Sequence, residues 1–413
     1  MSALGFLSIL LGFSAATFAF LRPDRIRVTF FVLAYLLHIA ASIAFYEITK
    51  NSSADAQLYY YDPTNMYDDG FGFGTQFIVF LVQWMRLTIG GTFLDYFLLF
   101  QVVGFFGIAL LMRIFEEIYA ELAIPQPIWT YLLVLLPSLH YWSGALGKDS
   151  LFFFAIVLAI WGAMSIQRRM IYFGAAMLAM LVIRPHVAVL GLTSIALTIL
   201  PDKSVKLWMR GGLAIVAVLG AAYAAVSFLS TFKLESGSDI ISDRATTREQ
   251  VLQSDDAGRS AVNAIYPVRV LSLLFRPLFF DVQDMLGGFA SVENALILVL
   301  FCVFLLRFRL VISLIRRVPY VRFCFWFSAA LVLVLGWDYF NIGLGLRQKW
   351  TMIMPNILAI YLTLFAVRAS QARAAAPPGP AWLQPARGHA LEPRLVNAPG
   401  WQAAPPARTR WTP

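Results

Sequence analysis

Charged residues and cysteines are both scarce in this chain. Only 13% of its 413 residues are charged and 60% are hydrophobic, whereas about 25% are charged in an ordinary soluble protein. This apolar excess is too large for one protein core, so we expect lipid to surround much of the chain. The two cysteines, Cys302 and Cys324, lie in or beside apolar segments, and no CxxC pair occurs. These features exclude a disulfide framework and a cysteine-based metal site.

Several familiar signatures are also missing. The sequence has no P-loop, no HExxH, no GxSxG and no Rossmann glycine fingerprint, so nucleotide hydrolysis and protease chemistry have no support. It shows no internal repeat, which weighs against an inverted-repeat transporter. The net charge of +9 does not indicate nucleic-acid binding, because the basic residues gather at the ends of apolar segments, where anionic lipid favours them.

Apolar segments dominate the chain and predict an all-α, polytopic transmembrane bundle. A helix that crosses a bilayer core of about 30 Å needs roughly 20 apolar residues. The N-terminal segment lacks a basic start, so we expect a first span and not a cleaved signal. About eleven spans are predicted, at 3–21, 28–46, 94–112, 128–142, 151–166, 170–183, 187–200, 211–231, 290–306, 323–337 and 353–367.

The basic residues predict the orientation of the bundle in a bacterial inner membrane. Lys and Arg in short loops favour the cytoplasmic side, and this places the loops 47–92 and 232–288 in the periplasm. Within 47–92, Phe77 to Leu87 is expected to lie along the interface. The segment RFRLVISLIRR, which begins at Arg307, is expected to be a cytoplasmic interfacial helix on anionic lipid. Residues 1–368 form the predicted transmembrane domain, and 369–413 form an Ala/Pro-rich, disordered cytoplasmic tail.

The first outer loop reads SSADAQLYYYDPTNMYDDGFGFG. A carboxylate just beyond the second span is placed to accept a proton from a substrate hydroxyl, so Asp55 is the favoured catalytic base and Asp62 the second. Tyr59 and Tyr60 offer flat, amphipathic faces suited to sugar rings. The alternative interpretation is a solvated acidic loop with an aromatic interface belt.

Asp68 and Asp69 form an adjacent acidic pair in the same loop. One such pair without further ligands is weak evidence for a metal site. We therefore predict no metal ligands and no required cofactor. The alternative is a bound divalent cation.

A second segment, PSLHYWSGALGKDS (137–150), breaks the helical pattern with Pro and Gly at the outer face. It brings His140, Lys148 and Asp149 to a tight turn before a helix. A lysine beside a free helix N-terminus suits an anion such as phosphate. The alternative is a snorkelling lysine followed by a helix-capping aspartate.

Three later segments add cations on the same side. Arg184 ends a short span before Pro185, and Arg276 follows an apolar stretch. Arg347 and Lys349 lie outside, against the positive-inside trend, and an anionic phosphate would explain them. The alternatives are snorkelling side chains and pairing with the outer acids. His186 alone is typical of a packed or interfacial histidine, and Glu293 is expected to have a basic partner.

Four of these segments carry a resemblance to a known group. They are DAQLYY, PSLHYWSGALGKDSL, FRPLFFDVQD with the Glu-Asn that starts the next span, and NIGLGLRQKWTMIMP. They resemble segments of bacterial polytopic membrane proteins from exopolysaccharide and O-antigen clusters, which are related in layout to the GT-C glycosyltransferases. Together they cover much of residues 50–360.

The resemblance implies a GT-C-like fold and a function. GT-C enzymes use polyprenyl-phosphate-linked sugars and carry a catalytic Asp or Glu in the first outer loop, which would be Asp55 here. Donor phosphate would be bound by Lys148, Arg276 or Arg347. The expected function is therefore sugar transfer or polymerisation in surface polysaccharide assembly. The expected partners are a lipid-linked saccharide donor, membrane lipids and other polysaccharide-assembly proteins, with no nucleic acid. The alternatives are a flippase of a lipid-linked saccharide and a non-catalytic subunit of an export complex.

Overall fold

The computed structural model describes residues 2–20, 24–51, 54–201, 265–282, 285–337 and 342–375, with scattered residues between 207 and 218. Within these ranges the chain is helical and contains no strand. The elements are α1 (Ala3–Phe20), α2 (Arg25–Thr49), α3 (Asp55–Tyr61), α4 (Thr75–Ile89), α5 (Phe93–Glu121), α6 (Trp129–Leu132), η1 (Leu133–Leu135), α7 (Pro137–Ser143), α8 (Lys148–Met164), α9 (Ile166–Ile183), α10 (Pro185–Ile199), α14 (Tyr266–Phe275), η2 (Phe279–Asp281), α15 (Met285–Leu306), α16 (Phe308–Arg317), α17 (Pro319–Trp337), α18 (Ile342–Gln348), η3 (Lys349–Ile353) and α19 (Met354–Ala375).

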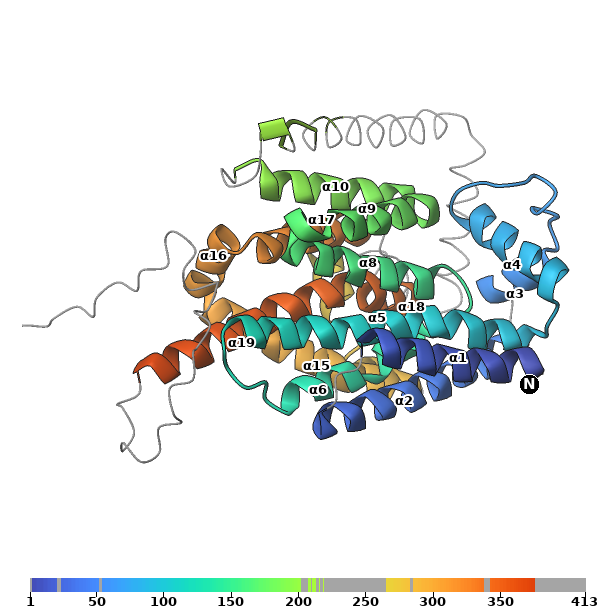
Figure 1. Ribbon diagram of the computed structural model, residues 1–413, viewed down its shortest axis with the longest axis horizontal. Helices are drawn as coiled ribbons and strands as arrows, with labels where there is room; N and C mark the ends of the chain where they lie inside the picture. The colour runs from blue at the N-terminus through green and yellow to red at the C-terminus, as the bar shows by residue number, and fades with distance from the viewer. Residues whose placement is uncertain are drawn as a thin grey trace, which may run out of the picture.

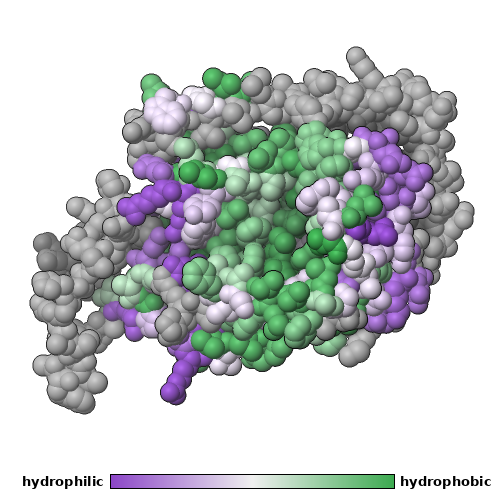
Figure 2. All heavy atoms as spheres, turned by 45° about the vertical axis from the view of Figure 1, so that its right-hand side comes forward, coloured by the Kyte–Doolittle hydropathy of each residue, from purple (hydrophilic) through white to green (hydrophobic). Residues whose placement is uncertain are grey.

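The long helices run side by side along the longest axis of the molecule (Figure 1). Seven helical segments within the described residues are long and apolar enough to cross a membrane, or eight if α7 and α8 count as one broken span. A wide hydrophobic band lies between hydrophilic residues at the two ends (Figure 2). These features fit a polytopic membrane protein, since a helix satisfies its own backbone hydrogen bonds in lipid.

The expected number of about eleven spans is not confirmed. The expected span 128–142 is interrupted, because Leu136 is extended before Pro137 and the chain divides into α6, η1 and α7. A residue before proline is driven away from the α region. The expected span 187–200 corresponds to α10, which has only 15 residues. The expected span 211–231 and the loop from 232 to 264 lie outside the continuously described ranges.

Burial divides the bundle into central and peripheral helices. We compared the most apolar stretch of 18 residues in each helix. In this stretch 89% of the residues are buried in the continuous helical segment 342–375 and 72% in α5, whereas only 22% are buried in α1. The apolar outer faces of α1 and α2 therefore lack protein neighbours, as expected for helices that face lipid. Helix α19 continues to Ala375, past the expected domain end at residue 368.

Two helix breaks at one end of the bundle position the polar residues described below. The pair α7–α8 is bent by 115° at residues 144–147, where Gly147 has φ +139°, a conformation that glycine adopts without strain. Arg184 separates α9 from α10 with φ −147° and ψ 82°, as the following proline requires. Here the outer loop docks on the bundle, since the Gly74 N–H donates to the Val182 carbonyl over 2.8 Å.

Candidate functional site

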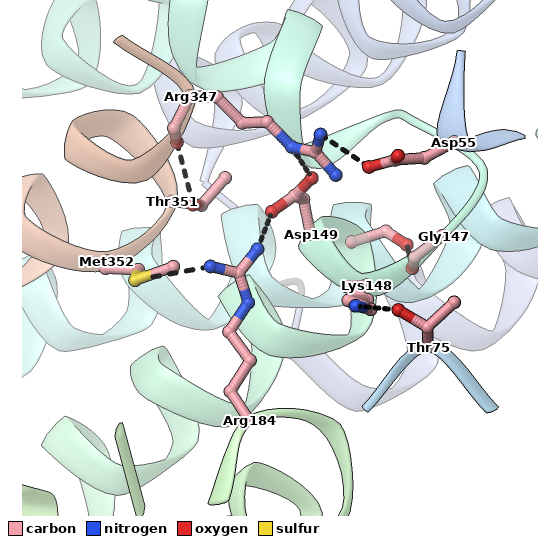
Figure 3. A network of polar contacts seen from close by, with 10 residues as sticks. Asp55, Thr75, Gly147, Lys148, Asp149, Arg184, Arg347, Thr351 and Met352 are labelled. Carbon is pink, nitrogen blue, oxygen red and sulfur yellow. Dashed lines mark hydrogen bonds and ion pairs between the residues drawn. The ribbon is translucent and has the colours of Figure 1, made fainter. Parts of the chain in front are cut away.

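A buried carboxylate, Asp149, binds two arginines from distant parts of the chain. Its Oδ1 accepts a hydrogen bond of 2.8 Å from Arg184 Nη2, and its Oδ2 pairs with Arg347 Nε (Figure 3). The Asp149 side chain is 2% exposed. It comes from the first turn of α8, where the helix dipole also favours a negative charge. Removing either partner from an ion pair this buried is costly, because the remaining charge would lack compensation.

Arg347 connects this buried carboxylate to an exposed one. Its Nη1 lies 2.9 Å from Oδ2 of Asp55, whose side chain is 56% exposed. Asp55 is the first residue of α3, and Arg347 lies in the last turn of α18, just before the π-helical turn η3. The result is a network of alternating charge, Asp55–Arg347–Asp149–Arg184, in which Asp55 is the solvent-exposed end. We refer to these four residues as the ion network.

Lys148 lies beside the ion network and has a different partner. Its Nζ donates to Thr75 Oγ1 over 2.6 Å (Figure 3). No carboxylate of a described residue forms an ion pair with it. Lys148 Nζ therefore lies outside the ion pairs of the described ranges, at the edge where the outer loop meets α8. This is a suitable position for contact with an anionic ligand.

Tyr59 packs under the turn that carries Lys148. It is 1% exposed, and a Cβ built at Gly147 would lie 2.5 Å from its Cε2 atom. Burial, reinforced by the negative charge of Asp55, raises the pKa of the Tyr59 hydroxyl well above its usual value. The hydroxyl therefore stays protonated, which excludes Tyr59 as a general base at neutral pH. Its position supports the turn, and its buried ring is not free to stack on a sugar.

The other predicted residues of the first outer loop have local partners. Asp62 terminates α3 in the left-handed conformation, and its two carboxylate oxygens accept the N–H groups of Met66 and Tyr67 over 2.8 and 2.9 Å. Tyr60 is buried, and its hydroxyl donates to the Gly91 carbonyl. Asp62 and Tyr60 thus hold the loop together, and neither forms a hydrogen bond or ion pair with the ion network in the described part of the chain. Asp68 and Asp69 are exposed.

Lys349 belongs to a second polar cluster, below α14. It is fully buried, and its Nζ donates to Asn294 Oδ1 over 2.5 Å and to the Leu274 and Arg276 carbonyls over 3.2 Å each. Asn294 in turn donates to the Pro277 carbonyl over 2.7 Å. Lys349 therefore fixes the chain after α14 against α15 and the π-helical turn. Its ammonium group is enclosed by protein groups and not presented to a ligand.

Arg276 is likewise paired within its own segment. Its Nε donates to Asp281 Oδ2 over 3.0 Å, and a second contact joins Nη2 to Oδ1. Burial alone would raise the pKa of Asp281, but the hydrogen bonds from Arg276 and from the Leu278 N–H outweigh it and hold the pKa below its ordinary value. Glu293 accepts the Ser138 N–H over 2.9 Å and does not pair with an arginine in the described residues.

His140 is not brought into contact with the ion network. It is fully buried in the bundle, where its Nδ1 lies 3.1 Å from Nδ1 of His38 and its Nε2 lies 2.7 Å from the Val134 carbonyl. This places it at a helix contact between α2 and α7. Asp338 lies outside the described residues.

The structure therefore gathers Asp55, Lys148, Asp149, Arg184 and Arg347, and separates them from Arg276 and Lys349. Sequence reasoning missed the role of Asp149, which is buried and forms ion pairs with two arginines. It also missed Thr75, for which the only signal was its position at the start of an amphipathic helix. In the described ranges, no three His, Cys, Asp or Glu side chains gather as metal ligands.

Comparison with known proteins gives no relative from which a function could be transferred: no protein-family model, no curated protein and no solved structure matches this chain.

Proposed function

We propose that this protein is a GT-C-like membrane glycosyltransferase or polymerase that uses polyprenyl-phosphate-linked or -pyrophosphate-linked sugars in surface polysaccharide assembly. The observation that carries the proposal is the ion network, in which an exposed carboxylate meets an arginine that a buried carboxylate holds in place. Such a site offers both a base and a preorganised cation. These are the two groups needed to activate a sugar hydroxyl and to stabilise a departing phosphate.

The phosphate would bind by replacing Asp55 on Arg347. The Asp55–Arg347 contact is the exposed link of the network, and exposed ion pairs contribute at most about 1 kcal/mol. The Arg347–Asp149 contact lies deeper and would persist, keeping the guanidinium aimed at the phosphate. Lys148 would add a second charge from the adjacent turn. Arginine and lysine both bind phosphate oxygens through charge-assisted hydrogen bonds.

Release from Arg347 would free the Asp55 carboxylate to act as the base. The acceptor hydroxyl oxygen would attack the anomeric carbon of the donor sugar and pass its proton to Asp55. The bond from the anomeric carbon to the phosphate oxygen would break, and the polyprenyl phosphate or pyrophosphate would leave with the bonding electron pair. Arg347 and Lys148 would stabilise the negative charge that develops on it. The periplasmic face of an inner membrane, predicted from the loop charges, is where such polymer assembly would occur.

The test is a reconstituted reaction with a matched control. Purified protein in lipid nanodiscs is incubated with radiolabelled polyprenyl-pyrophosphate-linked saccharide, and both the polymer and the released carrier are measured. We expect product from the wild type and from Asp69→Asn, which removes an exposed acid of the same loop, but not from Asp55→Asn. Product formation by Asp55→Asn at the wild-type rate would contradict the assignment of the base. Absence of product with any donor, together with movement of the lipid-linked saccharide across proteoliposomes, would favour a flippase instead.

A further inference from the structure

A second polar feature occurs at the end of the bundle that is opposite to the ion network. A hollow of about 580 Å³ lies where α15, α16 and α19 meet, and it is lined by Arg307, Arg309 and Arg368 together with Gln371, Leu306, Phe308 and Leu310. We refer to it as the arginine hollow. All three arginines are exposed, and no acidic residue lines the hollow. It therefore combines three positive charges with apolar walls.

The helical segment 342–375 fixes the distance between the two polar features. Arg347 and Arg368 lie on this one segment. At 1.5 Å per residue, their separation of 21 positions spans roughly 30 Å, which is the thickness of a bilayer core. Figure 1 shows α18 and α16 toward opposite ends of the long axis. The arginine hollow thus lies at the membrane interface that the ion network does not occupy.

Helix α16 has the properties of a helix that lies in an interface. Its Val311 and Leu314 are 1% exposed and pack on the bundle, whereas Arg309, Arg316 and Arg317 are exposed. Such segregation is typical of interfacial amphipathic helices. The end of α16 is also fixed, since the Arg322 guanidinium donates to the Ile315 carbonyl over 2.9 Å and to the Thr198 carbonyl of α10 over 2.8 Å. The helix that contributes Phe308, Arg309 and Leu310 to the hollow is therefore anchored to the bundle.

We infer that the arginine hollow binds the headgroup of an anionic phospholipid. The three guanidinium groups suit a phosphodiester with a net negative charge, and Leu306, Phe308 and Leu310 offer apolar contact to the first part of the acyl chains. A soluble phosphate ester would match the arginines but not the apolar walls. A zwitterionic lipid would match the walls but would bring no net charge.

The experiment measures lipid binding to the delipidated full chain by native mass spectrometry. Phosphatidylglycerol is titrated against phosphatidylcholine, with glycerol phosphate as a soluble competitor. We expect phosphatidylglycerol to bind with clear preference and to be released as salt increases. Each of Arg307→Gln, Arg309→Gln and Arg368→Gln should weaken its binding about 5-fold, and the triple variant on the order of 100-fold.

The matched control is Arg316→Gln with Arg317→Gln, which removes two exposed charges of the same helix that do not line the hollow. It should weaken phosphatidylglycerol binding less than 3-fold, which is a smaller loss than the loss of about 5-fold expected for each arginine that lines the hollow. An equal loss in this control, or equal binding of phosphatidylglycerol and phosphatidylcholine, would overturn the assignment. Displacement of the lipid by equimolar glycerol phosphate would also overturn it and would identify a site for soluble phosphate esters. The three single variants keep the test decisive if the triple variant does not fold.

Discussion

Arg347 and Asp149 form an ion pair across 198 positions of sequence, and this pair joins the last helical segment of the bundle to the first turn of α8. The contact lies directly beneath the exposed Asp55, which Arg347 also binds. A buried carboxylate thus orients an arginine that also binds an exposed carboxylate.

Replacing Asp55 should separate catalysis from stability. Asp55→Asn keeps the size of the side chain but removes the proposed base, so we expect the proposed transferase activity to fall by about 10²–10⁴-fold. Because the Asp55–Arg347 pair is exposed, the midpoint of thermal unfolding should hardly change. The activity assay and a thermal unfolding curve in detergent measure the two effects. A large drop in the unfolding midpoint would mean that Asp55 is structural.

Replacing Asp149, in contrast, should clearly lower the stability of the protein. Asp149→Ala leaves Arg184 and Arg347 without their shared carboxylate, and breaking a buried pair by removing one partner lowers stability by about 3–5 kcal/mol. We expect a clearly lower unfolding midpoint in detergent. Asp55→Asn is the matched control because it removes an exposed carboxylate from the same arginine. Equal stability of the two variants would show that the buried pair contributes little.

The turn before α8 should not tolerate a side chain. At Gly147, alanine would be strained by the φ of +139° and would contact the Tyr59 ring, so Gly147→Ala should lose at least about 1–3 kcal/mol of stability. At Gly174, inside α9, an added Cβ has no neighbour within 4 Å. Gly174→Ala should therefore be neutral or gain about 0.5–1 kcal/mol. Comparison of the two unfolding midpoints checks the prediction, and similar midpoints would argue against the described turn.

Acid should weaken the segment held by Asp281. The pKa of Asp281 in the folded protein lies below its ordinary value of 3.8, so its contribution to stability is complete above the unfolded value and is lost as the pH falls through the folded value. We expect the wild type to be more stable than Asp281→Asn at pH 6. The two unfolding midpoints should converge as the pH drops below about 4. A constant difference over this range would exclude the ionised pair with Arg276 as its cause.

The predicted orientation can be tested by labelling. In a background with Cys302→Ser and Cys324→Ala, single cysteines are introduced as Asp69→Cys and Gln371→Cys, both at exposed positions. A membrane-impermeant maleimide added from the periplasmic side should label the first and leave the second unlabelled. Lysis should make both reactive. The reverse pattern would place the ion network in the cytoplasm.

The amino-acid sequence by itself determined the helical, lipid-facing class of this protein, because that class follows from local composition and from the length of apolar segments. It also indicated one site that holds Asp55, Lys148, Arg184 and Arg347, but it assigned Arg276 and Lys349 to the same site, whereas these two have other partners. Loop charge likewise predicted the side on which they meet, which labelling has yet to test.

Only the tertiary structure decided which of these charges pair. Whether Asp149 meets Lys148 or two distant arginines depends on how α8, α9 and α18 are rotated and packed, and sequence spacing carries no information on packing between remote helices. The same is true of Lys349, which lies two residues from Arg347 but contacts the Leu274 and Arg276 carbonyls at the end of α14, because residues two apart on a helix point in different directions.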